Sequence, residues 1–527
     1  MSFPPRIRDP YRPLLMALAA VAWMTTHITA AGAQDIALQV DDYEIEGFNP
    51  LSNSRTRSIL RPFTGELAGI STILEAATTL ERAIQDEGYA LISVIVPEQP
   101  VSGRVIRLQT QGFVIANVES TGNEHFSDQN ILRSAPSLAR GAHPNLEPLQ
   151  RSLSVANLHP FKRVTLNFVS RERDSREIDV NLAVQDREPR QFFAWLNDTG
   201  TDDTGEYRLG LGYQHGNLFD RDHVGTFTFT TSPDQIEDVR QFGLNYRFPL
   251  YRAGGYVDLL AFDSDIDTGR VAEVFDVAGR GRTYRAAYTQ LLPKRGGYSH
   301  KAYAAVADKL FDNDITFQSN DLVADVRSRP LELGYEFKWQ RERVTLVNDF
   351  SWRRNLPGGE FNDEDDYDAS RAGADRDWQA FAYNGSVQVT AGAWRVVGGV
   401  RAQLADEPLI AGEQFGIGGQ NSVRGFEERE LTGDKGYSVS LEVWAPQYRS
   451  FSFLGFVDHG RIEREDPLPG ELDSAGIASA GVGMRWRSPQ RHWSVRVDAA
   501  HVIDGSGPAG ATQDGDSRLH FTLVYRR

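Results

Sequence analysis

The amino-acid sequence predicts a transmembrane antiparallel β-barrel of about sixteen strands, preceded by two small α+β domains. Three observations lead to this prediction. Residues 1–33 have the composition of a secretion signal. The following segment, up to residue 189, mixes short alternating strands with amphipathic helices. From Arg190 onward helical periodicity disappears, and alternating apolar and polar runs of roughly ten residues recur.

Length and composition exclude several classes of protein. The chain has 527 residues, which exceeds one ordinary soluble core, so more than one folded unit is expected. The net charge of -16 argues against nucleic acid as a partner, because phosphate binding requires a basic surface. There are no cysteines, so disulfides and thiolate metal sites are impossible.

The N-terminal segment has the three parts of a signal peptide. Arg6, Arg8 and Arg12 form the basic region, and Leu14–Met24 is an apolar run too short to span a bilayer as a helix. Ala31-Gly32-Ala33 is a small-residue cleavage site, so Gln34 is expected to begin the exported protein. No later segment approaches the roughly 18 consecutive apolar residues of a membrane-spanning helix.

The first small domain is predicted at residues 34–112. Its longer helix is expected to begin near Thr72, with Glu75 completing a capping box, and to end at Gly88. The expected order is strand, helix, helix, strand, strand, at Tyr43–Phe48, Arg55–Leu60, Thr72–Gly88, Ala90–Val96 and Val105–Thr110.

The second small domain, at residues 113–189, repeats this order. Ser127 and Asn145 are expected to cap its two helices, and strands follow at Val164–Val169 and Ile178–Val184. A three-stranded sheet of this kind has exposed edges, which can accept an extended chain as an added strand. An alternative interpretation is that the two domains are rigid spacers.

The remainder, residues 190–527, is predicted to form the barrel. Apolar residues from Leu331 to Trp339 alternate with polar ones, as in strands that face lipid on one side and a watery lumen on the other. Short connections such as Gln447–Ser450 contrast with long polar ones such as Asn355–Asp377, which fits periplasmic turns and outer loops. Tryptophans near strand ends could form interfacial girdles: Trp195, Trp339, Trp352, Trp444 and Trp493.

One long loop, Phe415–Gly436, is the most informative stretch of the chain. The loop that contains most of it is predicted at residues 405–434 and joins the predicted eleventh and twelfth strands. Six glycines make it a loop, but an apolar residue, a cation, a glycine and an aromatic follow one another in its middle. The candidate loop residues are Gly418, Gly419, Ser422, Val423, Arg424, Gly425 and Phe426.

These loop residues resemble the VRGF loop motif of the outer-membrane transporter superfamily that includes two-partner secretion (TpsB) transporters and barrel-assembly insertases. Further on, Phe456, Asp458 and Gly460 resemble the F-x-D-x-G strand motif of the same superfamily. The resemblance implies that the loop folds back into the barrel and that Arg424 pairs with Asp458. Glu442, inward-facing on the preceding strand, is a candidate second partner; the alternative is an ordinary lumen carboxylate.

The resemblance also identifies the small domains as POTRA domains and the chain as a TpsB transporter of the haemolysin secretion/activation type. It implies export of an unfolded haemolysin- or haemagglutinin-like exoprotein through the outer membrane of a Gram-negative bacterium, with the POTRA domains in the periplasm. Implied partners are outer-membrane lipids and, during biogenesis, the barrel assembly machinery and periplasmic chaperones. The chain departs from the family in ending on Arg526-Arg527 and in leaving little room for a plug helix before the first domain.

Three other functions stay open at this point: a factor that inserts outer-membrane proteins, a passive porin or surface adhesin, and an outer-membrane enzyme. No catalytic motif occurs, so we expect no enzyme activity, no cofactor and no metal. The acidic run Asp363–Asp368 lacks the central glycine and distal glutamate of a calcium loop and is predicted to be a solvated outer loop.

Overall fold

The computed structural model describes residues 38–67, 69–100, 104–171, 175–201, 204–236, 239–265, 268–271, 275–278, 280–312, 316–317, 320–321, 325–507 and 512–527. The predicted signal peptide, its cleavage site at Ala33 and the segment up to residue 37 lie outside the described residues. The chain divides into two compact units after Phe113. Among the described residues, no helix is both long and apolar enough to cross a membrane.

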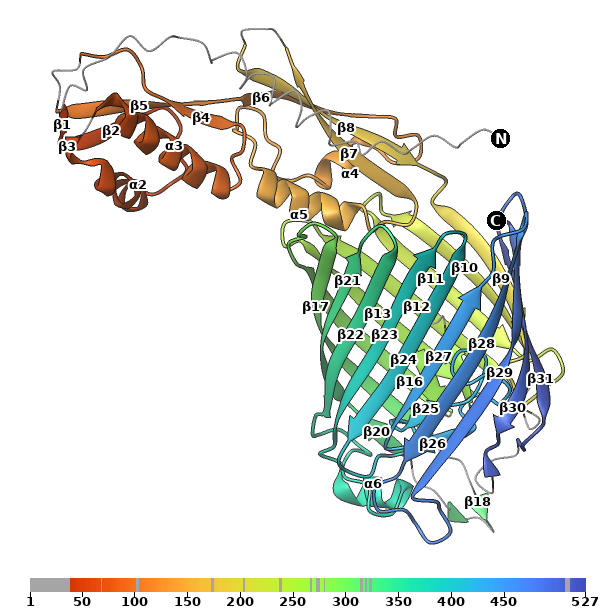
Figure 1. The fold of residues 1–527 in the computed structure, drawn as a ribbon. Helices are drawn as coiled ribbons and strands as arrows, with labels where there is room; N and C mark the ends of the chain where they lie inside the picture. The colour runs from red at the N-terminus through yellow and green to blue at the C-terminus, as the bar shows by residue number, and fades with distance from the viewer. Residues whose placement is uncertain are drawn as a thin grey trace. The chain divides into compact units, whose positions relative to one another are not determined.

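The first unit has the predicted order of strand, helix, helix, strand, strand (Figure 1). In its sheet, β5 lies between β2, which runs parallel to it, and β4, which runs antiparallel. A second small sheet of β1 and β3, which sequence reasoning missed, joins it. The elements are β1 (Leu38–Val40), β2 (Asp42–Glu46), α2 (Asn53–Leu60), a 3-10 turn (Arg61–Phe63), β3 (Gly65–Leu67), α3 (Ile70–Asp86), β4 (Ile92–Ile95) and β5 (Val105–Gly112).

The start of helix α3 corrects the predicted capping box. The helix begins at Ile70, its N-cap is Gly69, and no side chain caps it, so Thr72 and Glu75 lie inside the first turns. The helix is amphipathic, because Ile73, Leu80 and Ile84 on one face are buried in one core with the sheet.

The second small domain belongs to the second unit and has the same element order. It comprises β6 (Val114–Thr121), α4 (Asp128–Arg133), α5 (Leu146–Ala156), β7 (Lys162–Ser170) and β8 (Glu177–Asp186). The sheet order is β6–β8–β7. Ser127 and Asn145 cap α4 and α5 as predicted, since each side chain accepts a hydrogen bond from a backbone N–H of the first turn.

A closed antiparallel barrel follows, in which the last strand pairs with the first. β20 and β21 both pair with β17 and are separated by Arg329 alone, so they form one wall strand and the described barrel has sixteen. The wall elements are β9 (Arg190–Asn197), β10 (Arg208–Leu218), β11 (His223–Thr231), β12 (Arg240–Leu250), β13 (Gly255–Ser264), β16 (Gly281–Leu291), β17 (Tyr298–Phe311), β20 (Val326–Ser328), β21 (Pro330–Gln340), β22 (Val344–Asn355), β23 (Gln379–Ala391), β24 (Trp394–Ala405), β27 (Lys435–Trp444), β28 (Phe451–Glu463), β29 (Ser474–Arg487), β30 (Trp493–Asp504) and β31 (Ser517–Arg526). The predicted fold class is confirmed.

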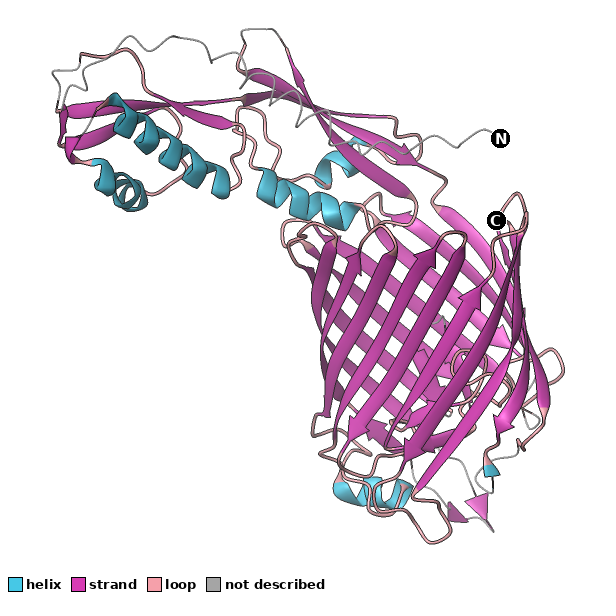
Figure 2. Ribbon diagram, in the orientation of Figure 1, coloured by secondary structure: helices cyan, strands magenta, loops and turns pink. Residues whose placement is uncertain are grey.

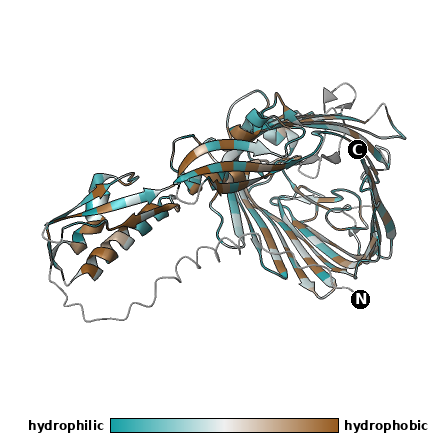
Figure 3. Ribbon diagram, turned by 90° about the horizontal axis from the view of Figure 1, so that it is seen from above, coloured by the Kyte–Doolittle hydropathy of each residue, from teal (hydrophilic) through white to brown (hydrophobic). Residues whose placement is uncertain are grey.

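The two faces of the wall alternate as the sequence predicts. Leu211, Leu333 and Leu519 are exposed on the outer face, while Asp458 and Ser479 are buried on the inner one. Apolar and polar residues alternate along the strands, and chain segments lie inside the ring (Figure 3). Two predicted girdle residues are wrong: the Trp195 ring lies over Gly210 on the inner face, and Trp444 donates a hydrogen bond to Glu442.

The connections at the two ends of the barrel differ in length. Those at one end are tight turns, such as 219–222, 341–343 and 445–450, and those at the other are long, such as 356–378 and 406–434. The acidic run predicted as a solvated loop instead contains helix α6 (Glu364–Ser370), which has an Asp363 capping box and a fully buried Tyr367 (Figure 2). The other small strands, in long connections, are β14 (Thr268–Val271), β15 (Phe275–Ala278), β18 (Thr316–Phe317) and β19 (Asn320–Asp321).

The second small domain is attached to the tight-turn end through buried polar contacts. The Lys162 ammonium lies 2.6 and 2.7 Å from the two carboxylate oxygens of Asp222, in the β10–β11 turn, and donates to Asn130 Oδ1 at 2.7 Å. Tyr251, in the β12–β13 turn, donates to the same carboxylate. Burial lowers the pKa of Lys162, and Asp222 opposes this effect.

Candidate functional site

The connection between β24 and β27, residues 406–434, folds into the barrel and is called the inner loop below. Its strands β25 (Phe415–Ile417) and β26 (Leu431–Gly433) pair with each other. Ile417, Val423 and Phe426 of this loop are fully buried in a cluster with wall residues such as Ile462 and Ile477. Hydrophobic burial therefore holds the inner loop against β28–β30, besides any polar contact.

Glycine is required at the bends of the inner loop. Gly418, Gly419 and Gly425 have φ angles of 110°, 92° and 100°, which disfavour other residues. A Cβ at Gly418 would also lie 2.4 Å from the carbonyl oxygen of Glu427, and one at Gly419 would collide with the Glu428 carboxylate. The backbone N–H of Ser422 donates to the Gly419 carbonyl at 3.1 Å, which closes the turn before the tip.

Arg424 at the loop tip forms a two-pronged ion pair with Asp458 of β28. Its Nε lies 2.7 Å from Asp458 Oδ2 and its Nη2 lies 2.9 Å from Oδ1. Its Nη1 donates to Glu442 at 2.9 Å, and Nη2 donates to the Ser440 hydroxyl at 3.2 Å. Arg424 is 3% exposed and Asp458 is 0% exposed, so the pair is shielded from water.

The strand-motif residues form the seat of this tip. The Arg424 guanidinium lies over the Phe456 ring, 3.5 Å from its centroid. A Cβ at Gly460 would lie 3.0 Å from both Ile417 and Val423, so glycine makes room for the inner loop. The F-x-D-x-G spacing thus supplies a stacking surface, an anion and a gap from one inward face of one strand.

The negative and positive side chains around the loop tip are equal in number. Asp498 of β30 lies 3.9 Å from Arg424 and is itself paired with Arg485 at 2.6 Å and Arg496 at 2.7 Å. With Asp458 and Glu442, the cluster holds three carboxylates and three guanidinium groups. A buried charge is tolerated only where it is paired, so these six residues depend on one another.

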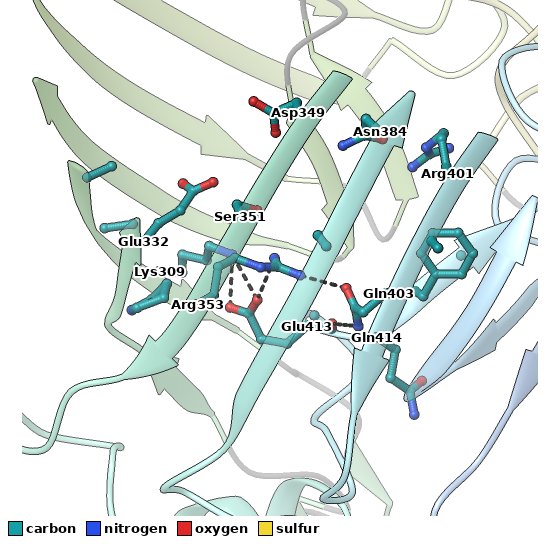
Figure 4. Close-up of a pocket in the computed structure, with 18 of the residues that line it drawn as sticks. Lys309, Glu332, Asp349, Ser351, Arg353, Asn384, Arg401, Gln403, Glu413 and Gln414 are labelled. Carbon is teal, nitrogen blue, oxygen red and sulfur yellow. Dashed lines mark hydrogen bonds and ion pairs between the residues drawn. The ribbon is translucent and has the colours of Figure 1, made fainter. Parts of the chain in front are cut away.

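The loop base is attached to the opposite wall by Glu413 (Figure 4). Its carboxylate accepts hydrogen bonds from Lys309 of β17 at 2.9 and 3.1 Å and lies 3.7 Å from Arg353 of β22. Gln403 of β24 bridges β22 and the inner loop, since it accepts a hydrogen bond from Arg353 at 2.6 Å and donates one to the Glu413 carbonyl at 3.0 Å. A polar cavity of about 400 Å³ lies beside this contact and separates the loop from the wall.

The end of the inner loop is attached to the long connection that contains α6. Arg371 donates from both terminal guanidinium nitrogens, Nη1 and Nη2, to the Asp434 carboxylate at 2.6 and 3.2 Å. The Asp434 carboxylate is fully buried and also accepts the backbone N–H groups of Leu409 and Glu465, each at 2.8 Å. Trp378, fully buried, packs with Leu409 in the same region.

The structure brings together all the residues that the sequence singled out: the loop motif, the strand motif and Glu442. Sequence reasoning missed Glu413, Asp434 and Asp498, because carboxylates are common on lumen-facing positions and nothing in their local sequence marks a partner. Period-two alternation on β30 could have marked Asp498 as inward-facing. In the part of the chain that the structure describes, no cluster of acidic residues or histidines could hold a metal ion.

A sixteen-stranded barrel that encloses its own inner loop, and carries a small α+β domain at its tight-turn end, places the chain in the class of closed β-barrels with a loop folded into the lumen. The haemolysin secretion/activation protein family ShlB/FhaC/HecB matches residues 176–486, and the ShlB-type POTRA domain matches residues 38–110. The chain belongs to this family, whose members are transporters. The resemblance inferred from the two sequence motifs is thereby confirmed.

Known relatives are distant in sequence. The outer membrane transporter CdiB of Dickeya dadantii (strain 3937) is 20% identical over 430 residues, covering 76% of this chain and 73% of the relative. CdiB of Escherichia coli O6:K15:H31 (strain 536 / UPEC) is 20% identical over 466 residues, covering 83% and 75%.

Solved structures share the fold. CdiB from Escherichia coli superimposes with a TM-score of 0.72 at 16% identity, covering 98% of this chain and 97% of the other. BamA from Haemophilus ducreyi lacking POTRA domains 1-3 gives a TM-score of 0.53 at 14% identity, covering 94% and 100%. At these identities the likeness concerns the fold alone.

Proposed function

We propose that this protein exports an unfolded haemolysin- or haemagglutinin-like exoprotein across the outer membrane of a Gram-negative bacterium. The POTRA domains, at residues 34–112 and 113–189, lie in the periplasm, and the barrel, residues 190–527, is surrounded by outer-membrane lipids. The barrel assembly machinery and periplasmic chaperones act during its biogenesis. The inner loop closes the resting lumen and is displaced when the substrate passes.

One observation carries this proposal: the inner loop, a segment of the chain itself, occupies the lumen and is held there by polar contacts that can be broken. Its ends are fixed in the wall, while its tip and base are attached through Arg424 and Glu413. A passive porin has no need of such a loop seated on a six-charge cluster. Ion pairs are suited to reversible attachment, because water and a passing polypeptide can satisfy the same groups once the loop moves.

Substrate entry is proposed at the free edge of β7 in the second POTRA domain. Val164 on this edge is already paired, because its N–H and C=O both bond the Asn157 side chain, at 2.8 and 2.9 Å. Leu166 and Phe168 present their N–H and C=O groups in the same direction by strand alternation. Among the described residues these two have no partner on that edge, so an extended chain can add there.

The matching edge of the first POTRA domain, on β4, is shorter and mostly occupied. The Val94 N–H donates to Glu81 of α3 at 2.8 Å, and Gln85 donates to the Ile92 carbonyl at 3.3 Å. Side chains thus satisfy the groups that an added strand would need. We infer that an extended substrate prefers β7 to β4.

Cysteine cross-linking tests this preference, since the chain has no native cysteine. Val169→Cys on β7 should trap the exoprotein through a short bifunctional reagent, and Ser93→Cys on β4, also exposed, serves as the matched control. Equal yields at both positions, or a higher yield at Ser93→Cys, would contradict the assignment of β7.

Export itself is tested by comparing secreted and surface proteins of cells with the intact chain, without it, and with Arg424→Ala. Loss of one large exoprotein, trapped or degraded in the periplasm, is the expected result. A simultaneous loss of many barrel proteins would instead indicate an insertion factor. An unchanged secretome with lower uptake of small solutes would indicate a passive porin.

A further inference from the structure

The wall of the barrel is closed by a short junction between β31 and β9, called the seam below. Its register runs from the pair Asn197–Thr522 to the pair Phe193–Arg526, and Phe192 and Arg527 exchange two further backbone hydrogen bonds, each of 2.8 Å. Residues 517–521 of β31 extend beyond the end of β9 toward the long-connection end, where they pair with β30 alone. By contrast, β9 pairs along its whole length with β10.

Asp198 directly follows β9, and its side chain continues the contact with β31 beyond the last backbone pair of the seam. Its Oδ1 accepts the backbone N–H of Phe521 at 2.8 Å, and its Oδ2 lies 2.8 Å from Nδ1 of His520. A single carboxylate therefore joins the first strand to two successive residues of the last one. Without it, the Phe521 N–H would have no partner across the seam.

His520 also contacts the inner loop. The backbone N–H of Gly425, the residue after Arg424, donates to His520 Nε2 at 2.9 Å. Because Nε2 accepts this bond, the geometry assigns the ring proton to Nδ1, which donates to Asp198. His520 is only 3% exposed, so water cannot readily replace either partner.

We propose that His520 is a positioning residue that couples docking of the loop tip to closure of the seam. This inference rests on the proposed role of the inner loop as the closure of the transport path. When the tip withdraws, Nε2 loses its donor inside a buried pocket, and the ring is free to rotate away from Asp198. The outer end of the seam then opens more often.

Neighbouring contacts also join the inner loop to β31. The Thr522 hydroxyl donates to Gln420 Oε1 at 2.8 Å, and Arg518 lies 3.5 Å from Glu427. The inner loop thus binds β31 at three successive inward positions. Coupling between two states is reciprocal, so a loosened seam must also favour release of the loop.

Backbone hydrogen exchange of the purified full chain in lipid nanodiscs tests the coupling in both directions, with no exoprotein present. Among the described residues, Arg424 has no hydrogen bond or ion pair with β9 or β31, yet Arg424→Ala should speed exchange about tenfold at residues 190–198 and 517–522. His520→Leu should speed exchange at residues 415–430 of the loop as well as at the seam. His520→Gln, which keeps one donor and one acceptor, should restore much of the protection.

The control is Asp349→Asn. This lumen carboxylate of β22 accepts a hydrogen bond from Tyr303 and, among the described residues, forms no hydrogen bond or ion pair with the inner loop. If Arg424→Ala impairs assembly, Val423→Ala loosens the buried tip without removing a charge. The coupling is refuted if exchange rises in the loop while both seam segments keep wild-type protection, or if His520→Leu changes the seam alone. Because no substrate is involved, a failed export experiment leaves this result unaffected.

Discussion

At the scale of single residues, the loop tip is held by the need to pair a buried charge, that of Arg424. Arg424 is among the least exposed charged residues of the barrel, and its guanidinium is satisfied by Asp458, Glu442 and Ser440 together. Each partner is worth little in isolation, because desolvation offsets most of the attraction. Removal of one partner is costly, because it leaves the others buried without a counter-charge.

Arg424→Ala should therefore free the inner loop while leaving the barrel folded. Loss of one member of a buried pair typically costs about 3–5 kcal/mol, which falls here on loop docking and not on the strand ladder. Export of the exoprotein should drop by at least tenfold, and the protein should still resist unfolding in SDS without heating. Arg285→Ala, which breaks a wall pair with Glu332 at 2.9 Å, is the matched control and should export normally. Normal export by Arg424→Ala would argue against the tip as a functional lock.

At the scale of elements, the inner loop is a folded insertion with attachments at its tip, base and end. The count of alternating runs predicted its position between the eleventh and twelfth strands, and the resemblance to a known superfamily implied that Arg424 at its tip pairs with Asp458. The base and end attachments were not predictable. Glu413 and Asp434 meet partners on β17, β22 and the α6 connection, which are separated from them by up to 104 residues, and only the closed barrel brings these elements together.

The base attachment predicts a distinct phenotype for Glu413→Gln. The neutral side chain cannot balance Lys309 and Arg353, so hydrogen bonds worth about 1.5–3 kcal/mol each are weakened. In planar lipid bilayers the variant should show more frequent and longer openings than the wild type, at unchanged expression. Glu332→Gln, which alters a wall pair facing the same cavity, should keep the wild-type open probability. Equal conductance traces for the two variants would contradict a role of Glu413 in holding the loop.

At the scale of the whole molecule, the second unit joins a POTRA domain to the barrel through buried groups. His159 is part of this attachment: its Nε2–H donates to the Gly216 carbonyl at 2.6 Å, and its Nδ1 accepts from the Phe161 N–H at 3.2 Å. Burial lowers the pKa of His159 to about 4; nearby Lys162 acts in the same direction, whereas Asp222 and the Gly216 carbonyl oppose it. The attached state therefore requires a neutral ring.

This requirement predicts that mild acid weakens the attachment. Above about pH 6.5 neither state binds a proton at His159, and the full stability is present. As the pH falls from about 6.5 to 4, the detached or unfolded state gains a proton first, so stability falls by up to roughly 1.4 kcal/mol per pH unit. Limited proteolysis between β8 and β9 should accelerate over this range. His159→Gln should flatten this acid dependence, and an identical profile for the two proteins would exclude His159 as its source.

Local periodicity was sufficient for the element order of both small domains, since strands and amphipathic helices differ in the spacing of apolar residues. It failed at the start of α3, where Thr72 and Glu75 match a capping box but the helix begins two residues earlier, at Ile70, with Gly69 as its N-cap. The prediction of girdle residues also failed for Trp195 and Trp444. A tryptophan near a strand end can face lipid or the lumen, and its odd or even position along the strand decides which.

The sequence by itself predicted the barrel, its strand number and the site of the inner loop, because these follow from alternation along the chain. The Arg424–Asp458 pair was implied by the resemblance of two sequence motifs to those of a known transporter superfamily. The tertiary structure alone decided what else holds the loop. Glu413 with Lys309, Asp434 with Arg371, and Gly425 with His520 and Asp198 are contacts across a closed ring. No feature of the neighbouring sequence marks these residues, because the partner of an inward-facing side chain is the residue that barrel closure places opposite it.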